Sequence, residues 1–291
     1  MERGGIKSED WALFPRVLRA RGWRLYTEGG KRLVDLWQYG GRALLGHTPP
    51  QLLRAFKNVA ERGLFAPLPN PAEGRLYRAL SRLLPRRGFR LYRTEAALEQ
   101  AVAAGGFSPS TVDPALGMDG AVPENCPLLW RPWLRDPAVL NPGLPVVEGA
   151  PLLIPVLPLP FPGAPAILAL DPALEDRFPP VPPLSPAAAA AGERAVLALL
   201  AAPGRSLTAA LDRVLTAGSF WKRRGIYLHY DPVDAAASAG NGPAPEYKTV
   251  FMDFLAGGFL LPPSREEPAI IPGELSAGEG AQLAKLAGGQ D

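Results

Sequence analysis

The segment from Leu91 to Ala101, LYRTEAALEQA, carries residues that could bind an anion. An apolar run leads into Thr94, whose side chain can cap a helix, and Glu95 opens that helix. The first N–H groups of a helix are free and its dipole is positive at that end, so such a corner attracts phosphate. Arg93 could bind phosphate through two hydrogen bonds, but it fills the space that a glycine would leave for close approach. The segment therefore has two interpretations, a phosphate cradle and a plain strand–turn–helix corner.

The composition describes a globular chain with many loops. Of its 291 residues, 47% are hydrophobic and 20% are charged, and glycine and proline occur 31 and 35 times. This length allows a sizeable core in one large domain or two ordinary ones. The net charge of +3 is too mild to predict a nucleic-acid partner.

Cysteine usage and the N-terminus favour a reducing, cytoplasmic setting. Cys126 is the single cysteine, so no disulfide can form within the chain, and with only His47 and His229 beside it no metal site is expected. The first residues lack the apolar run of a signal peptide. The apolar stretch 145–170 is cut by prolines, each of which costs a helix about 3 kcal/mol, so no membrane span is predicted.

Polar caps and turn residues mark where the elements begin and end. Helices are expected to open at Thr48, Asn70, Ser185, Ser206 and Ser276, with capping boxes at Asn70/Glu73 and Ser276/Glu279. Short strands are expected at 23–26, 32–36, 89–93, 152–157, 166–170, 225–229 and 259–261. Residues 105–150 and 231–246 lack periodicity and are expected to be loops. The alternation of strands and helices predicts an α/β fold with a partly parallel sheet.

The N-terminal segment resembles the opening of class III aminotransferases, which are pyridoxal-phosphate (PLP) enzymes of fold type I. It has the hairpin around a glycine, Gly30, then Asp35 after the second strand, then a Gly-His turn at Gly46 and His47 before a helix opened by proline. His47 is interpreted as a capping or packing residue of that turn rather than an acid–base group.

The segment YRTEAALEQA is similar to the Ser-Gly-Thr-Glu-Ala turn of that family, whose helix holds the cofactor phosphate. Thr94 and Glu95 are in register, whereas Tyr92 and Arg93 replace the serine and the glycine. The resemblance implies that Arg93, Thr94 and Glu95 bind the cofactor. It also implies that Asp171, after the run AILAL, stands where the family has the aspartate that holds the pyridine nitrogen. A turn-forming role is the alternative for Asp171.

Two further stretches extend the resemblance towards the C-terminus. SPAAAAAGERAVLALL resembles the helix that leads out of the family's large domain, and GIYLHY and GELSAGEGAQL resemble its small domain. The implied organisation is an N-terminal segment of the small domain at 1–50, a reduced large domain with a proline-rich middle at 51–204, and a C-terminal small domain at 205–291. The implied fold is α/β and PLP-transferase-like, with a reduced large-domain sheet.

The catalytic groups that this family carries in its large domain are missing from the sequence. The family has an Asp-Glu pair on one strand and, on the next, the lysine that forms the Schiff base. The lysines of this chain are Lys7, Lys31, Lys57, Lys222, Lys248 and Lys285. None lies between 57 and 222, and arginine cannot replace the missing amine because it stays charged. Lys222 remains as a weak candidate, on the small-domain side of the resemblance.

We therefore expect a degenerate class III aminotransferase-like protein without transaminase activity, acting as a binding or subunit-like protein. The retained terminal parts imply a dimer, formed with a second copy or with a full-length relative. One alternative is an active PLP-dependent aminotransferase that uses Lys222 or a lysine from another chain, and another is a chain with no selected function. Neither a nucleic acid nor a membrane is expected as a partner.

Overall fold

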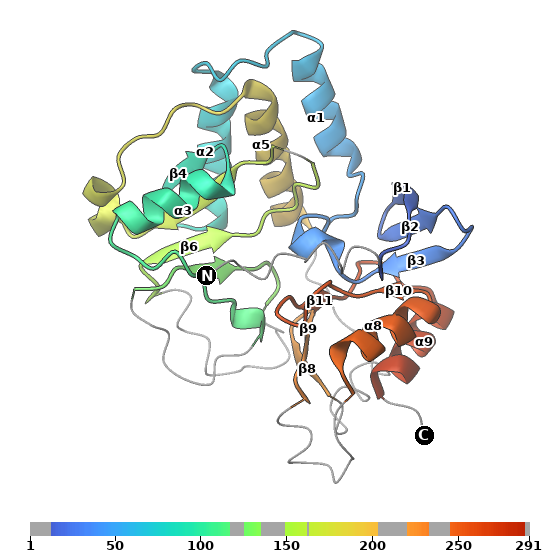
Figure 1. The fold of residues 1–291 in the computed structure, drawn as a ribbon. Helices are drawn as coiled ribbons and strands as arrows, with labels where there is room; N and C mark the ends of the chain where they lie inside the picture. Colours follow the sequence, from blue (N-terminus) through green and yellow to red (C-terminus); the bar gives the residue numbers. More distant parts are fainter. Residues whose placement is uncertain are drawn as a thin grey trace. The chain divides into compact units, whose positions relative to one another are not determined.

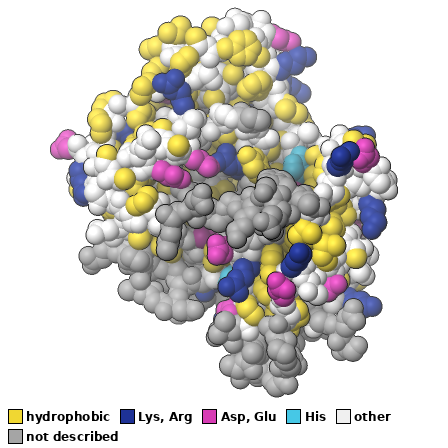
Figure 2. Space-filling model, viewed as in Figure 1, with side chains coloured by type: hydrophobic (Ala, Val, Ile, Leu, Met, Phe, Trp, Pro, Cys, Tyr) yellow, Lys and Arg dark blue, Asp and Glu magenta, His cyan; other side chains and the backbone are white. Residues whose placement is uncertain are grey.

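The computed structural model describes residues 13–116, 125–134, 149–161, 163–202, 220–232 and 245–288 (Figure 1). These residues form two compact units. The central unit comprises residues 48–116, 125–132, 149–161 and 163–202, and the terminal unit comprises 13–47, 133–134, 220–232 and 245–288. On the face drawn in Figure 2, basic and acidic side chains are interspersed, in keeping with the mild net charge. The helix expected at Ser206 lies outside the described residues.

The central unit is built on a four-stranded sheet of order β4-β7-β6-β5. Its strands are β4 (Gly88–Tyr92), β5 (Leu128–Trp130), β6 (Leu152–Pro155) and β7 (Ala166–Leu170). β7 runs antiparallel to β4 and β6, whereas β5 and β6 are parallel. The predicted partly parallel sheet is thus confirmed, and the carboxyl ends of β4, β5 and β6 lie along one edge of it. Strand β5 corrects the expectation that 105–150 is loop throughout.

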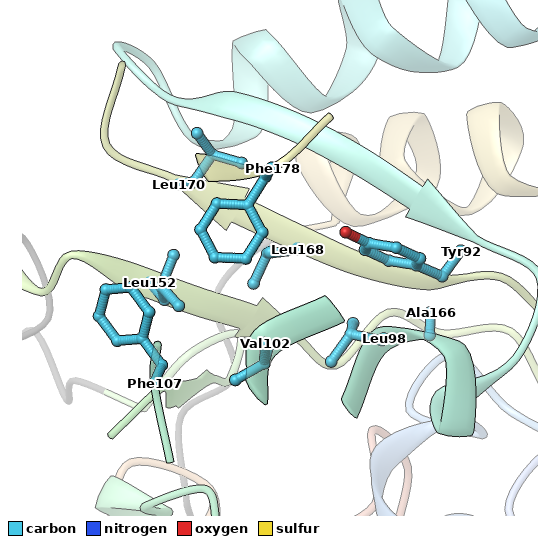
Figure 3. Packing of buried hydrophobic residues seen from close by; sticks show 9 residues of the cluster. All are labelled: Tyr92, Leu98, Val102, Phe107, Leu152, Ala166, Leu168, Leu170 and Phe178. Carbon is cyan, nitrogen blue, oxygen red and sulfur yellow. The ribbon is translucent and has the colours of Figure 1, made fainter. Parts of the chain in front are cut away.

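Helices cover both faces of this sheet. They are α1 (Pro50–Ala60), α2 (Pro71–Leu83), α3 (Glu95–Ala104) and α5 (Pro186–Ala201). α3 packs on one face, where Leu98 and Val102 meet Tyr92, Leu152 and Leu168 in one apolar cluster (Figure 3). On the other side α2 and α1 both pack against α5, and α2 also lies against β4 (Figure 1).

The caps of these helices explain where they begin. Asn70 accepts hydrogen bonds from the N–H groups of Ala72 and Glu73, at 3.0 and 3.2 Å. The expected capping box is wrong in its second half, because the Glu73 carboxylate accepts from the N–H of Leu184 at 3.1 Å instead. Glu73 therefore fastens α2 to the residues that precede α5.

Two other expected caps have opposite outcomes. Ser185 caps α5 as predicted, accepting from the N–H of Ala188 at 3.2 Å. α1 begins at Pro50, and its N-cap is Pro49, without a side-chain hydrogen bond, rather than Thr48. The fixed φ of proline stands in for a polar cap there.

The terminal unit contains two small sheets of order β1-β2-β3-β10 and β11-β9-β8. The first sheet is formed by β1 (Val17–Arg21), β2 (Arg24–Thr27), β3 (Arg32–Asp35) and β10 (Phe259–Leu260). The second is formed by β8 (Trp221–Arg224), β9 (Tyr227–Tyr230) and β11 (Ala269–Ile270). The predicted β2–β3 hairpin is confirmed, whereas the edge strand β1 had no counterpart among the expected strands.

Two helices complete this unit, α8 (Tyr247–Ala256) and α9 (Ala277–Gly288). The capping box predicted for α9 is present: Ser276 N–H donates to Glu279 Oε2 at 2.8 Å, and Glu279 N–H donates to Ser276 Oγ at 3.2 Å. Glu279 also receives Arg24 Nη2 at 2.7 Å and Arg32 Nη2 at 3.4 Å. The hydrogen bond from Arg24 is the main reason that the pKa of Glu279 falls from 4.5 to about 2. In the described part of the chain, no helix has the length and apolarity to cross a bilayer.

Candidate functional site

The edge at which β4, β5 and β6 end is the candidate site, because ligands of open α/β sheets bind outside the carboxyl ends of the strands. The first residues beyond these strands are Arg93 after β4, Arg131 after β5 and Val156 after β6. None of the four strands of the sheet contains an aspartate, a glutamate or a lysine. The edge is therefore lined by arginine and apolar residues at the points where strands end.

The corner after β4 has the local structure that its sequence predicts. Thr94 is the N-cap of α3, and its Oγ1 accepts from the N–H of Ala97 at 3.1 Å. Arg93, Thr94 and Glu95 are all exposed, and Arg93 makes no hydrogen bond or ion pair with a described residue. The corner thus presents a helix N-terminus and one guanidinium to solvent, a combination that suits an anion.

Asp171 lies at the other edge of the sheet. In the antiparallel register, Tyr92 is opposite Ala166 and Gly88 is opposite Leu170, so Asp171 follows the end of β7 that adjoins the start of β4. Asp171 and Arg93 are therefore separated by the length of the five-residue strand β4, which is about 17 Å at about 3.3 Å per residue. Asp171 is exposed, and its Oδ1 accepts from the N–H of Ala173 at 2.9 Å as the cap of a short 3-10 helix, η4 (Pro172–Arg177). The structure brings Arg93, Thr94 and Glu95 together and leaves Asp171 apart from them.

A buried ion pair that sequence reasoning missed joins the end of β5 to a preceding turn. Arg131 Nε donates to Asp113 Oδ1 at 2.9 Å, and Nη2 donates to Oδ2 at 2.6 Å. The two side chains are only 5% and 9% exposed. Asp113 Oδ1 also accepts from the N–H of Ala115 at 3.0 Å. The carboxylate of Asp113, which lies alongside β5 through the Val112–Leu128 bridge, is therefore fully engaged.

Lys57 and Lys222, the two lysines whose position decides whether a Schiff base could form, are both in ion pairs. Lys57 is the one lysine in the sequence of the central unit; it lies on α1, is 76% exposed, and has its Nζ 3.6 Å from Glu61. Lys222 lies in β8 of the terminal unit, with its Nζ 3.0 Å from Asp231 Oδ2. The side chain of Lys222 is 40% exposed.

The Gly-His turn of the terminal unit is held by backbone and side-chain bonds. His47 Nε2 lies 2.8 Å from Asp35 Oδ2, and Asp35 Oδ1 accepts from the N–H groups of Trp37 and Gln38, each at 2.9 Å. Gly46 adopts φ +91°, and a Cβ there would lie 3.2 Å from the Gly22 backbone. These bonds support the packing role of His47.

The residues after β3 are strained. Gln38 and Tyr39 have φ values of 49° and 52°, which side chains with a Cβ rarely adopt. Gln38 Nε2 donates to Ile270 O at 2.8 Å, while its Oε1 is buried without a partner. The two bonds that Asp35 accepts hold this segment, η2 (Gln38–Gly41), in its unfavourable conformation.

An arginine-rich stretch precedes the candidate corner. Residues 75–93 contain seven arginines and no acidic residue, a segregation that the net charge of +3 conceals. Two of them have structural partners within the central unit: Arg87 Nη1 donates to Ala150 O at 2.5 Å, and Arg90 Nε donates to Phe178 O at 2.6 Å. Burial lowers the pKa of Arg87, and the nearby Asp171 partly offsets this.

Solved structures share the fold of this chain. An ω-transaminase from Sphaerobacter thermophilus superposes with a TM-score of 0.64 at 15% identity, covering 94% of this chain and 90% of that one. A β-phenylalanine aminotransferase from Variovorax paradoxus gives 0.66 at 17% identity, with coverages of 99% and 90%. A glutamate-1-semialdehyde-aminomutase from Pseudomonas aeruginosa gives 0.63 at 15%, with 94% and 86%. At these identities the likeness establishes the fold, and it confirms the predicted fold class.

Sequence relatives match shorter segments. A Treponema pallidum protein named only as uncharacterized is 38% identical over 119 residues, which are 41% of this chain and 36% of that protein. A glutamate-1-semialdehyde 2,1-aminomutase from Syntrophus aciditrophicus is 35% identical over 72 residues, 24% of this chain and 17% of the relative. The matched parts therefore span 36% and 17% of these relatives' own lengths. No protein-family model matches the chain.

The residues at the candidate site fit a phosphate group but do not fit covalently held PLP. Arg93 and the N-terminus of α3 offer donors to a phosphate. No lysine of the central unit lies at this edge, since Lys57 is on α1. Neither carboxylate suits a ring nitrogen there, because Asp113 is bound to Arg131 and Asp171 is at the opposite edge.

Proposed function

We propose that this chain, which has the fold of the class III aminotransferases, lacks transaminase activity and acts as a binding or subunit-like protein. The observation that carries the proposal is the carboxyl edge of the central sheet, where the strands are followed by Arg93, Arg131 and Val156. PLP enzymes need a lysine that both binds the cofactor and moves the proton at the substrate carbon. An arginine stays charged and can do neither.

The corner at α3 is the part of the site that we assign to ligand binding. Thr94 keeps the helix start in place, Arg93 and the first-turn N–H groups would bind a phosphate or another anion, and Glu95 stabilises the helix dipole. We assign Asp171 to the turn that follows β7. A free cofactor bound through its phosphate alone is compatible with this assignment, and we place the protein in the cytoplasm.

The alternative, an active aminotransferase that uses Lys222, receives less support from the geometry. A Schiff base requires a free amine, whereas the Lys222 ammonium is held in an ion pair with Asp231 at 3.0 Å. We interpret that pair as a fastening between β8 and the residue after β9.

The decisive experiment tests for a PLP–lysine adduct. The full chain is incubated with PLP, its absorption spectrum is recorded, borohydride is added, and tryptic peptides are searched by mass spectrometry for a pyridoxyl group. We expect no internal-aldimine band and no stoichiometric adduct. An authentic aminotransferase treated in the same way is the positive control and should show both. A stoichiometric adduct at Lys222 that Lys222→Ala removes and Lys57→Ala retains would overturn the proposal.

A further inference from the structure

The exposed face of helix α2 consists of arginines and small residues. From position 74 to the end of the helix, the exposed residues are Gly74, Arg75, Arg78, Ser81 and Arg82. No acidic side chain lies among them, although protein surfaces ordinarily intersperse both signs of charge. The buried residues of the same helix face the core of the central unit. One whole side of α2 is therefore cationic and open to solvent.

The three arginines of this face lie in one row along the helix. Arg75, Arg78 and Arg82 are three and four residues apart, a spacing that places side chains on the same side of a helix. We call these three residues the α2 stripe. Arg86, which is also exposed, follows shortly after the helix ends and adds a fourth positive charge near its last turn.

The described part of the chain neutralises little of this charge. Arg75 Nε lies 2.9 Å from Glu193 Oε2, but Arg78, Arg82 and Arg86 make no ion pair or hydrogen bond with a described residue. Arg78 Nη1 lies 3.9 Å from where a Cβ on Gly74 would stand, so its guanidinium lies along the helix towards Arg75.

The neighbouring helix α1 shows the ordinary arrangement for comparison. It sets Lys57 one turn before Glu61, with their charged atoms 3.6 Å apart. Opposite charges at this spacing support a helix, whereas like charges at the same spacing repel. The stripe on α2 therefore carries a repulsion that an anion bound from outside would relieve.

The spacing of the stripe indicates an acidic helix as the anion. At 1.5 Å per residue, the arginines are about 4.5 and 6 Å apart along the axis, and carboxylates at i, i+3 and i+7 of a second helix have the same spacing. A guanidinium can bind a carboxylate through two parallel hydrogen bonds. Gly74 and Ser81, the other exposed residues of this face, are short and leave room for a helix to approach.

Other anionic partners match the face less well. The exposed residues of α2 include no aromatic side chain to stack on a base, and the net charge of +3 gives little long-range attraction to a nucleic acid. They also include no large apolar side chain to enter a lipid surface. Among the described helices of this chain, α3 alone has two carboxylates one turn apart, at Glu95 and Glu99, so a second copy lacks the third.

We propose that the α2 stripe binds an acidic helix of a different protein, one that presents three carboxylates at this spacing. The inference rests on the proposed function, because it names the chemistry of the partner that a binding or subunit-like protein would take. The contact is electrostatic, so its affinity falls as the salt concentration rises.

The recognition is tested by nuclear magnetic resonance on the full chain labelled with nitrogen-15. The probe is a synthetic alanine-rich helical peptide with glutamates at i, i+3 and i+7, and the Nε–Hε signal of each arginine is followed during the titration. The signals of Arg78 and Arg82 should shift and saturate, whereas that of Arg21, an exposed arginine of β1, should stay in place. A peptide with glutamines instead of the glutamates is the control. No shift with the glutamate peptide, or equal shifts at Arg21, would refute the proposal.

Substitutions test whether the stripe itself provides the affinity. Arg78→Gln and Arg82→Gln should each raise the dissociation constant of the glutamate peptide about threefold, and the double variant about tenfold. Arg21→Gln should leave it unchanged, and circular dichroism verifies that the variants are folded. The charge-reversed variant, Arg78→Glu with Arg82→Glu, should instead bind a peptide that carries lysines in place of the glutamates. A double glutamine variant that binds like the unchanged chain would contradict the proposal.

Two further probes separate the acidic helix from a phosphate surface. They are a single-stranded oligothymidylate and vesicles of phosphatidylcholine with phosphatidylglycerol. If either binds more tightly than the glutamate peptide and loses that affinity in the double glutamine variant, the acidic-helix partner is overturned. A PLP–lysine adduct would overturn the catalytic proposal and leave the stripe standing, whereas failure of the glutamate peptide to bind would do the reverse.

Discussion

The terminal and central units use their charged residues differently. In the terminal unit, Glu279 binds Arg24 and Arg32 and so joins α9 to the β2–β3 hairpin across some 250 positions of sequence. In the central unit, the principal buried pair, Asp113 with Arg131, is local and lies beside the candidate site. Motif residues of the terminal unit thus hold distant segments together, whereas the strands that end at the candidate site are followed by Arg93, Arg131 and Val156.

The largest effect is expected from breaking the central pair. Asp113→Asn removes the carboxylate that the buried Arg131 guanidinium binds through both Nε and Nη2, which should lower the free energy of unfolding by about 3–5 kcal/mol. The measurement is urea unfolding followed by circular dichroism. The double variant Asp113→Leu with Arg131→Met is the control, since replacing both charges by apolar groups should restore most of the loss. A loss below about 1 kcal/mol would show that solvent reaches the pair.

A smaller, pH-dependent effect is expected in the terminal unit. Glu279→Gln keeps the capping box, because glutamine can fill that position, but removes the charge that Arg24 binds. The folded-state pKa of Glu279 is lowered to about 2, so its contribution is present above about pH 4.5 and is lost as the pH falls towards 2. We expect a cost of about 2 kcal/mol at pH 7, after allowance for screening.

The check is the stability of both proteins from pH 7 to pH 2. The difference between the unchanged chain and Glu279→Gln should shrink steadily below about pH 4.5 and vanish near pH 2. Arg16 and Glu28, 3.6 Å apart and 85% and 59% exposed, provide a matched surface pair, and Glu28→Gln should change stability little at any pH. A difference that stays constant with pH would mean that Glu279 acts through packing alone.

Loss of the Thr94 cap of α3 should lower the free energy of unfolding by about 1 kcal/mol. Thr94→Ala removes the hydrogen bond that the N–H of Ala97 donates, whereas Thr94→Ser preserves it. Hydrogen exchange of the first-turn amides of α3 should quicken in the alanine variant and stay unchanged in the serine variant. Equal protection in both variants would show that the sheet, rather than the cap, holds this helix start.

The smallest effect is expected at Lys222. Its ion pair with Asp231 is partly exposed, so Lys222→Met should change the free energy of unfolding by about 0.5 kcal/mol or less. Thermal unfolding measures this, with Lys57→Met as the comparison on an exposed helix. A loss of several kcal/mol would indicate that the pair of Lys222 and Asp231 is an essential element of the terminal unit.

The sequence predicts those parts of the fold whose physics is local. Caps at Asn70, Ser185 and Ser276 and the hairpin before Asp35 were found because one polar side chain or one glycine decides each of them. Helix α8 was missed because its N-cap, Glu246, makes no side-chain capping bond. The polar start signal is thus absent, and what remains is the spacing of the buried Val250 and Phe254 and the glycine that ends the helix.

The missed parts of the site depend on residues far apart in the sequence. Asp113 and Arg131 are separated by 18 positions in a stretch without periodicity, and their pairing follows from the Val112–Leu128 bridge. The antiparallel register that moves Asp171 away from Arg93 is also a tertiary property. The lysine positions, in contrast, are read directly from the sequence, which has no lysine between 57 and 222.

Helix α5 limits the size of the side chains that the central unit can accommodate at its helix–helix contacts. It lies between α1 and α2, its residues from Ala187 to Ala191 are buried alanines, and a Cβ on Gly192 would come within 3.1 Å of the Leu76 side chain. Between Ala187 and Gly192 there is almost nothing to truncate. Enlargement is the hazard, since any added methyl group must push a neighbouring helix outward. Substitution from Ala187 to Gly192 is therefore restricted to small side chains, whereas Val196 and Leu199 of the same helix are buried and would leave a cavity if shortened.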